Sequence, residues 1–254
     1  MISISEAQLM AWISPVFWPF LRTLAVFTSA PVFSSRAFPM RAKIALAFFV
    51  ALGTQASMPP MPVIGFNDPQ VFGVVLQQVG IGLAIGFVVR VVFAAVELAG
   101  EVVGFQMGLN FAAFFDPTLG AQSSAVARFF GQMTSLLFVV MNGHLMVLLA
   151  INKSLHAFPI DQNFLEALKK MKLFHLGADL FASGLWIALP MVGMLMFTNL
   201  ALGIISRVAP QMNIFSIGFP ITLVVGLLGI TVTLPMLDQP FINLMGRAID
   251  VFGG

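Results

Sequence analysis

The sequence predicts an all-α, polytopic membrane protein built from about six long, partly bent apolar helices. Hydrophobic residues occupy 59% of the 254 positions and charged residues only 9%, which is about a third of the charged fraction of a soluble domain. The mean hydropathy is +1.00. Several apolar stretches also exceed the roughly 18 residues that a helix needs to cross a bilayer. Much of this chain is therefore expected to lie in a lipid bilayer.

Six apolar stretches follow one another, separated by connections that contain proline or glycine. They are 9–33, 43–57, 71–108, 126–151, 180–206 and 214–234. No cleavable signal is visible at the start, so the first stretch is expected to be retained. A polar connector at about 152–179 contains ALKKMK, which is typical of a short surface helix. We expect residues 1–254 to form a single integral membrane domain.

Glycines recur every four residues near the end of the third stretch, at Gly100, Gly104 and Gly108. On a helix they share one face, and a face without side chains lets another backbone approach closely. We therefore expect this face to pack against another helix or subunit. Pro117 then ends any helix shortly before it. Non-helical chain beside membrane helices is tolerated only where it is buried in protein or lines a cavity, so this loop predicts an interior such as a pore.

The basic residues conflict with six simple crossings. Arg36, Arg41 and Lys43 follow the first stretch and the lysine-rich connector follows the fourth, so simple crossings place them on opposite sides, whereas the positive-inside rule places both in the cytoplasm. Stretch 71–108 is the main candidate for an exception, because at ~1.5 Å per residue it would reach about 57 Å. We expect it to be bent, divided or projecting from the membrane. The alternative is that partner proteins set the orientation.

Charged side chains within the apolar stretches would each cost a few kcal/mol against lipid at the bilayer midplane, so each is expected to face protein, water or an interface. They are Arg22, Arg90, Glu97, Glu101, Arg128 and Arg207. Glu97 and Glu101 lie one helical turn apart and share a face. We expect this pair to bind basic residues of another helix or subunit, and a proton or cation relay is the alternative.

Motifs of catalysis are missing from the sequence. It has no HExxH, GxSxG or GxxxxGK[ST] run, no cysteine, and three histidines without metal-ligand spacing. We predict that the protein is not an enzyme and has no cofactor, catalytic residue or metal site. The formal net charge of +2 gives no indication of a nucleic-acid partner.

Two polar interruptions remain. Asn142, Gly143 and His144 interrupt the fourth stretch. They form either a hinge or proton-sensitive position, or a site where the histidine is hydrogen-bonded between packed helices. Two prolines bracket the second run, which favours a tight connection whose amides satisfy open backbone groups at helix ends. Its notable residues are Pro210, Gln211, Asn213, Phe215, Gly218 and Pro220.

Three runs in this order carry a resemblance to a known family. They are GEVVGFQMGLNFAAFFDP at 100–117, NGHLMVLL at 142–149 with SLHAFP at 154–159, and NLALGIISRVAPQMNIFSIGFP at 199–220. Together they resemble the FliR family, the flagellar members of the type III secretion export-gate proteins. The resemblance implies helical hairpins packed in a hetero-oligomeric ring with several FliP-like and FliQ-like subunits, and an FlhB-like switch protein as a further partner.

The resemblance also implies a function and a place. The chain would help to form a closed but openable conduit for unfolded flagellar export substrates across the bacterial inner membrane, at the flagellar basal body, with much of the complex on the periplasmic side. A plug is implied in the loop at 109–124. Phe111, Phe114 and Phe115 are the candidates for its seal, because aromatic side chains exclude water without fixed charge, and Asp116, Pro117 and Gly120 would shape its turn. A self-contained secondary transporter or ion channel is the alternative, and a structural scaffold is a third hypothesis.

Overall fold

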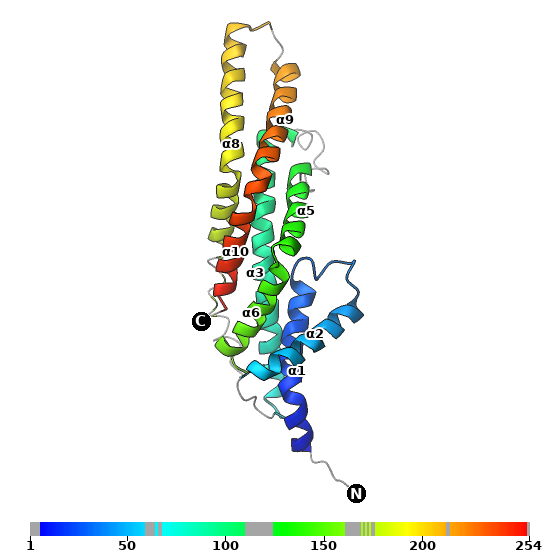
Figure 1. The fold of residues 1–254 in the computed structure, drawn as a ribbon. Helices are drawn as coiled ribbons and strands as arrows, with labels where there is room; N and C mark the ends of the chain where they lie inside the picture. The colour runs from blue at the N-terminus through cyan, green and yellow to red at the C-terminus, as the bar shows by residue number, and fades with distance from the viewer. Residues whose placement is uncertain are drawn as a thin grey trace. The chain divides into compact units, whose positions relative to one another are not determined.

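The computed structural model describes residues 6–58, 64–65, 68–109, 124–160, 169, 171, 173, 176–211 and 214–252. Within these ranges the chain forms helices and no strand (Figure 1). The α-helices are α1 (Glu6–Ser29), α2 (Met40–Thr54), α3 (Val71–Gln106), α5 (Ala125–Val140), α6 (Gly143–Ala157), α8 (Leu176–Val208), α9 (Ile214–Thr233) and α10 (Asp238–Asp250). Two short 3-10 helices are η1 (Gln55–Ser57) and η4 (Leu234–Met236). The all-α prediction is confirmed.

Four helices in the described part of the chain are long and apolar enough to cross a membrane, and a fifth span arises if α5 and α6 count as one broken span. The four segments are Met10–Ser29, Val71–Gln106, Leu176–Val208 and Ser216–Met236. Helix α2 has 15 residues and is not among them. The prediction of a polytopic membrane protein is thereby confirmed, although the second apolar stretch is too short for a simple crossing.

The break in the helices falls in the fourth stretch rather than the third. Helix α3 is continuous over 36 residues, so a divided third stretch is wrong. The fourth stretch ends its first helix at Val140 and resumes at Gly143. Between them Asn142 has φ 56° and ψ 30°, in the left-handed region that asparagine tolerates better than most residues.

Helix α10 has no counterpart among the predicted stretches. Its buried residues Phe241, Met245 and Ile249 recur every four positions along one helical face. Asp238 supports the start, because its Oδ1 accepts the backbone N–H of Gln239 at 2.7 Å. A search for long apolar runs misses such an amphipathic helix, since only one of its faces is apolar.

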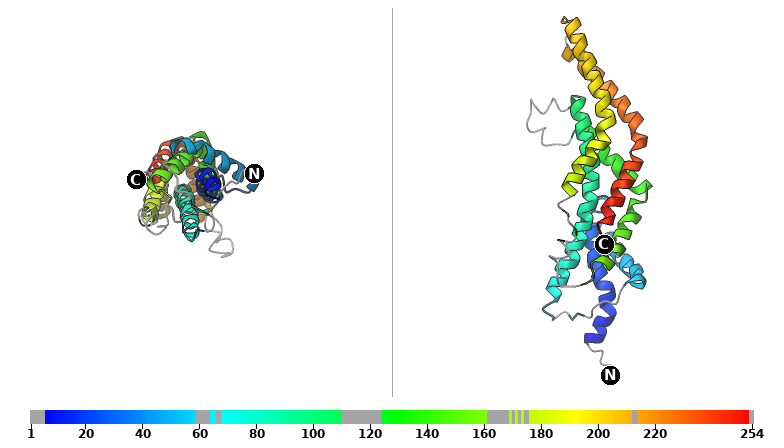
Figure 2. Two further views of the ribbon diagram at one scale, coloured as in Figure 1. Left: turned by 90° about the horizontal axis from the view of Figure 1, so that it is seen from below. Right: turned by 90° about the vertical axis from the view of Figure 1, so that its left-hand side faces the viewer.

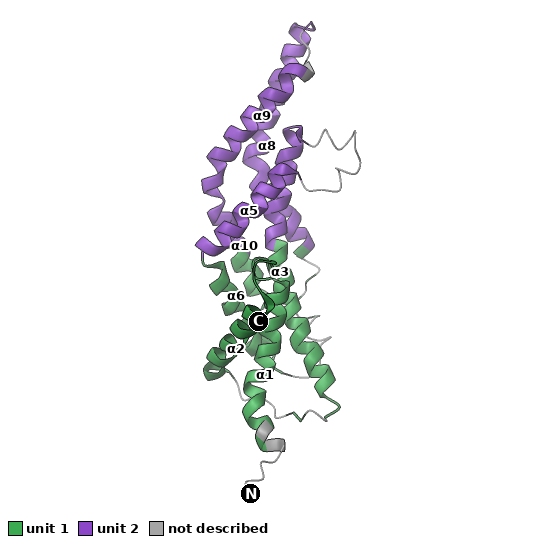
Figure 3. Cartoon of the chain, turned by 90° about the vertical axis from the view of Figure 1, so that its right-hand side faces the viewer, with its two compact units in different colours: residues 1–91, 142–176, 245–254 green, residues 92–141, 177–244 purple. Residues whose placement is uncertain are grey.

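The chain divides into two compact units (Figure 3). Unit 1 comprises 1–91, 142–176 and 245–254, and unit 2 comprises 92–141 and 177–244. The boundary at 91/92 lies inside the continuous helix α3, so it is no linker, and the single domain over 1–254 stays a prediction. The polar connector at 152–179 is helical at both ends, because α6 runs to Ala157 and α8 begins at Leu176.

Unit 1 is built on α1, against which α2 and the first half of α3 pack. Helices α1 and α2 lie side by side, with α2 crossing α1 obliquely (Figures 1 and 2). Two glycines of α3 allow close approach to α1: a Cβ added at Gly82 would strike the carbonyl oxygen of Arg22, and one at Gly86 would lie 2.9 Å from the backbone nitrogen of Ala30. Trp18, Ile64 and Val74 form a small buried cluster there.

Arg22 is a fully buried charged residue of unit 1, with 0% of its surface exposed. Its Nε donates to Oε1 of Gln78 at 2.8 Å. Its Nη1 donates to the carbonyl and hydroxyl oxygens of Ser154 at 2.6 and 3.1 Å, and Nη2 donates to the carbonyl of Phe158 at 2.9 Å. The guanidinium thus joins α1 to α3 and satisfies carbonyls at the C-terminal end of α6, where a cation is favoured.

Candidate functional site

The candidate site lies in unit 2, where the end of α3, the start of α5 and the middle of α9 meet. The glycine face of α3 is turned toward α5. A Cβ added at Gly100 would lie 2.7 Å from Cα of Ala127, and one at Gly104 would lie 2.9 Å from Oγ of Ser124. The backbones of α3 and α5 therefore approach so closely that any side chain at Gly100 would push them apart.

Gly108 has a different role from the two glycines before it. It follows the end of α3 with φ 80°, and its N–H donates to the carbonyl of Phe105 at 3.0 Å. This is the left-handed conformation in which helices commonly end and which glycine adopts without cost. A Cβ at this position would also lie 3.4 Å from the ring of Phe219 in α9.

Helix α9 holds the last turn of α3 at Met107. The Met107 side chain is fully buried and lies where a Cβ at Gly226 would otherwise stand. Oγ1 of Thr222 donates to the Met107 carbonyl oxygen at 3.2 Å. One of the carbonyls left open at the helix end is thus satisfied from a neighbouring helix.

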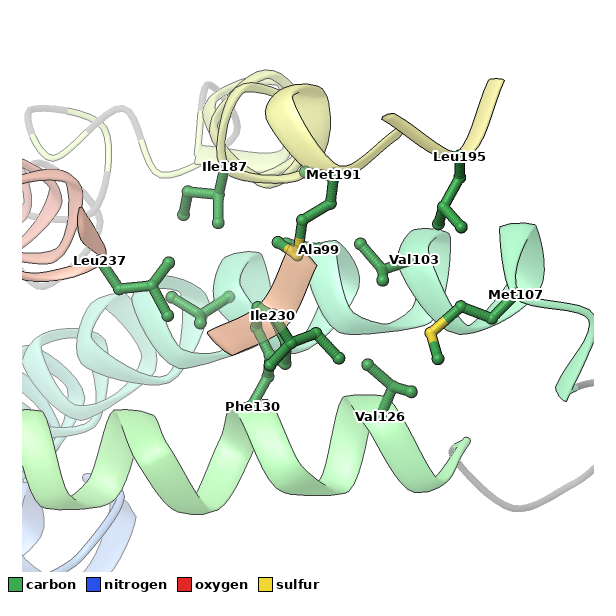
Figure 4. Close-up of a cluster of buried hydrophobic side chains, with 12 residues drawn as sticks. Ala99, Val103, Met107, Val126, Phe130, Ile187, Met191, Leu195, Ile230 and Leu237 are labelled. Atoms are coloured by element: carbon green, nitrogen blue, oxygen red, sulfur yellow. The ribbon is translucent and has the colours of Figure 1, made fainter. Parts of the chain in front are cut away.

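A buried apolar cluster supports this junction. It joins side chains of α3, α5, α8 and α9, of Met107 just after α3, and of Leu237 between η4 and α10 (Figure 4). The labelled members are Ala99, Val103, Met107, Val126, Phe130, Ile187, Met191, Leu195, Ile230 and Leu237. Two methionines and several branched side chains fill the space between helices, as flexible thioethers do in irregular cores.

Glu101 accepts a backbone hydrogen bond at the start of α5. Its Oε1 accepts the backbone N–H of Ser124 at 2.8 Å, and Oγ of Ser124 in turn accepts the N–H of Ala127 at 3.1 Å. Two open N–H groups at the helix start are thereby satisfied, and a carboxylate is electrostatically favoured at this end of a helix.

Glu97 is placed differently, one turn earlier on α3. It is exposed, and its carboxylate lies beside Gly131 of α5, where a Cβ would come within 2.7 Å of Oε1. The ion pair between described residues is Lys153–Asp250 at 3.5 Å, and it involves neither glutamate. Pairing of Glu97 with a basic residue of another subunit stays a prediction.

Replacing Glu101 by alanine is expected to cost about 0.5–2 kcal/mol of stability, because the Ser124 N–H loses its acceptor and the start of α5 loses a negative charge. Glu97→Ala is the matched control and should change stability far less. Thermal unfolding of both purified variants in mild detergent measures the difference. Equal losses in the two variants would contradict the capping role of Glu101.

Several predicted site residues lie outside the described residues, namely Phe111, Phe114, Phe115, Asp116, Pro117, Gly120 and Asn213. Their role stays a prediction. The remaining candidates are described at least in backbone. Asn142 is exposed before α6, whose second residue is the half-buried His144, and the intervening Gly143 is buried.

The second polar run is divided between a turn and a helix. Pro210 and Gln211 are exposed in the turn that follows α8. Phe215, Gly218 and Pro220 belong to α9, and Pro220 stands inside the helix. Between α8 and α9 the structure describes 209–211, so the tight connection predicted there stays a prediction.

Sequence reasoning missed the residues that hold the junction from the other helices. Ser124, Thr222 and Gly226 are small or polar residues on separate elements, and only the fold brings them to α3. Gly82 and Gly86 repeat the four-residue spacing of Gly100 and Gly104 in the first half of α3. That spacing was available in the sequence as an indication of a second close helix contact.

Comparison with known proteins gives one consistent result. Residues 13–248 match the model of the family described as bacterial export proteins, family 1. A protein named flagellar biosynthetic protein FliR from Pectobacterium carotovorum subsp. carotovorum is 38% identical over 256 aligned residues, covering 99% of this chain and 96% of that protein. The protein of the same name from Escherichia coli (strain K12) is 38% identical and covers 95% and 92%. That from Bacillus subtilis (strain 168) is 28% identical and covers 91% and 90%.

Proposed function

The chain belongs to the bacterial export proteins, family 1, and from this premise we propose that it is a subunit of the flagellar export apparatus. The observation that carries the proposal is the match over nearly the whole chain to proteins named flagellar biosynthetic protein FliR. Its role would be to help form an export conduit rather than to catalyse a reaction. The export substrates would be unfolded flagellar proteins, and the conduit would lie in the bacterial inner membrane at the flagellar base.

Partner subunits are proposed to cover much of α8 and α9. In the 18-residue apolar segment of α8, only 28% of the residues are buried within the chain. The share is 33% in the segment that begins in α9 and 61% in that of α3. Large side chains such as Trp186, Phe197 and Val208 are more than 70% exposed. Such exposed apolar side chains along two long helices support packing against FliP-like and FliQ-like membrane subunits in a ring, with an FlhB-like protein as a further neighbour.

The loop at 109–124 is proposed to close the conduit at rest. Support comes from the described residues at its two ends. The α3 end is held through Met107 by Thr222, and the α5 end is held through Ser124 by Glu101. A closing element needs fixed ends, so that its central residues return to one position after each passage.

Intact-complex mass spectrometry tests the proposed assembly. The tagged chain would be purified from its native membrane in mild detergent, and its companions would be identified and counted. We expect several copies of two other small membrane proteins. A lone chain or a homodimer would contradict the export-apparatus proposal and favour a self-contained transporter or channel.

Replacing Phe111, Phe114 and Phe115 together by serine is expected to raise the ion conductance of the assembled complex, since a hydrophobic constriction that excludes water becomes wettable. The matched control is Phe105→Ser, because Phe105 is 63% exposed at the end of α3 and outside the proposed seal. Conductance of the complex in planar bilayers measures the change, with subunit composition checked by mass spectrometry. Unchanged conductance in an intact complex would contradict the plug.

A further inference from the structure

Helix α2 is too short to cross a membrane alone, although it is apolar. Its 15 residues would extend about 22 Å at ~1.5 Å per residue, against a hydrocarbon core of about 30 Å. The helix crosses α1 obliquely within unit 1 (Figure 1). We therefore consider a position of α2 along the membrane surface.

The face of α2 that points away from unit 1 is apolar. Lys43, Ala47 and Ala51 form the buried face of the helix. On the exposed side, Phe49 is 69% exposed and Phe48 47% exposed. Single exposed apolar residues are ordinary, but adjacent exposed phenylalanines on so short a helix form a patch that needs a cover.

Exposed basic residues lie before this patch, and the one beyond it, Lys153, is paired with Asp250 at 3.5 Å. Arg36 and Arg41 are exposed at the beginning of α2. Beyond its end, Oγ of Ser57 donates to Oδ1 of Asn152 at 3.2 Å, which brings the end of α2 next to the segment that contains Lys153. The sequence from 30 to 58 has no aspartate or glutamate. An apolar patch preceded by two exposed arginines complements a leaflet that carries negatively charged headgroups.

The turn between α1 and α2 holds the helix in this position. The N–H of Phe33 donates to the carbonyl of Pro31 at 2.8 Å across Val32, whose φ is 68°. The Phe33 ring stacks on Phe27 at 4.7 Å and meets Phe38 edge-on at 6.4 Å. Such a tight, aromatic-packed turn fixes the direction in which α2 leaves α1.

We propose that α2 lies in the interface of an acidic phospholipid leaflet, with Phe48 and Phe49 at the acyl-chain boundary and Arg36 and Arg41 on headgroup phosphates. This assignment is independent of the conduit and the plug. It also removes the conflict in the positive-inside rule. If α2 does not cross, only α3 and the broken α5–α6 span separate Arg36 and Arg41 from Lys153, so all three lie on one side.

Cysteine accessibility tests the position of α2, because the chain has no cysteine of its own. Ser35→Cys places a thiol in the turn before α2, and Gly53→Cys places one in its last turn, where a Cβ meets no described atom within 4 Å. The tagged full-length chain in native membranes would be treated with a membrane-impermeant maleimide, in right-side-out and in inverted vesicles. We expect both thiols to react only in inverted vesicles. Every other pattern, including reaction from opposite sides or protection of both, would overturn the proposal.

Fluorescence quenching identifies what covers the patch. Phe49→Cys in the full-length chain would carry an environment-sensitive fluorophore, in vesicles of phosphatidylethanolamine with and without phosphatidylglycerol. We expect stronger quenching by a doxyl group near the headgroup than by one deep in the acyl chain. Lack of quenching by both would show a protein cover, and stronger deep quenching would show a crossing helix. Either result overturns the proposal.

Charge variants separate headgroup binding from simple hydrophobic insertion. In the same labelled chain, Arg36→Gln with Arg41→Gln is expected to abolish the increase in shallow quenching that phosphatidylglycerol produces. Arg247→Gln is the matched control, because Arg247 is also exposed in unit 1 and lies outside α2. An increase that persists in the double variant would overturn the assignment of Arg36 and Arg41 to phosphates.

Discussion

Arg22→Leu is expected to destabilise unit 1 by about 2–4 kcal/mol. The substitution leaves the carbonyl of Phe158 and the amide oxygen of Gln78 without the Arg22 donor, and each buried acceptor left open costs about 1–3 kcal/mol. The carbonyl of Ser154 loses one donor but keeps the backbone N–H of Phe158 at 3.0 Å. Removal of a buried charge, which is itself costly to desolvate, offsets part of this loss. The net effect should lower the thermal unfolding midpoint of the detergent-purified chain and speed proteolysis of unit 1.

Arg90→Leu is the control for this prediction. Arg90 is exposed, and among the described residues its Nη2 donates to the carbonyl of Ser29 at 3.1 Å. Its loss is expected to cost less than about 1 kcal/mol, as for other exposed polar contacts. Similar midpoints for the two variants would show that the Arg22 network contributes no special stability.

Gly100→Ala is expected to destabilise unit 2 by about 1–3 kcal/mol, the usual cost of overpacking. The added methyl would stand 2.7 Å from Cα of Ala127 and 3.1 Å from its nitrogen. These are backbone atoms, so α3 and α5 must separate rather than let a side chain rotate. Thermal unfolding in detergent would show the loss.

Replacing glycine by alanine is expected to stabilise the protein where a helix glycine has open space around it. A Cβ at Gly203 in α8 meets no described atom within 4 Å. Gly203→Ala should therefore stabilise the isolated chain by up to about 1 kcal/mol, through helix propensity. If both alanine variants were stabilised, the close approach of α3 and α5 would be refuted.

The long helices were predictable because composition and run length depend on local sequence alone. The same reasoning placed the third helix within two residues of α3, which ends at Gln106. It expected the third stretch to be bent, divided or projecting, and α3 is not divided. The helices break at Asn142, within the polar interruption that the sequence had indicated as a candidate hinge. Length indicates that a helix must project or tilt but does not indicate where a backbone will turn.

The partners of individual residues were not predictable. Arg22 was expected to face protein, water or an interface, but its acceptors come from 56 to 136 positions away in the chain. Glu101 was grouped with Glu97 because they share a helical face. The fold separates them, since only Glu101 meets the start of α5. Such distinctions depend on tertiary contacts that periodicity does not encode.

The order in which the segments are synthesised has a consequence for how the protein folds. Unit 1 contains 245–254 as well as 1–91 and 142–176, whereas all of unit 2 lies at or before residue 244. Unit 2 can therefore complete its contacts first during synthesis, while unit 1 must wait for residues 245–254 to leave the ribosome. Contacts so distant in the chain close slowly because of their loop entropy. A stop codon after residue 244 should thus leave unit 2 protease-resistant and unit 1 open to degradation.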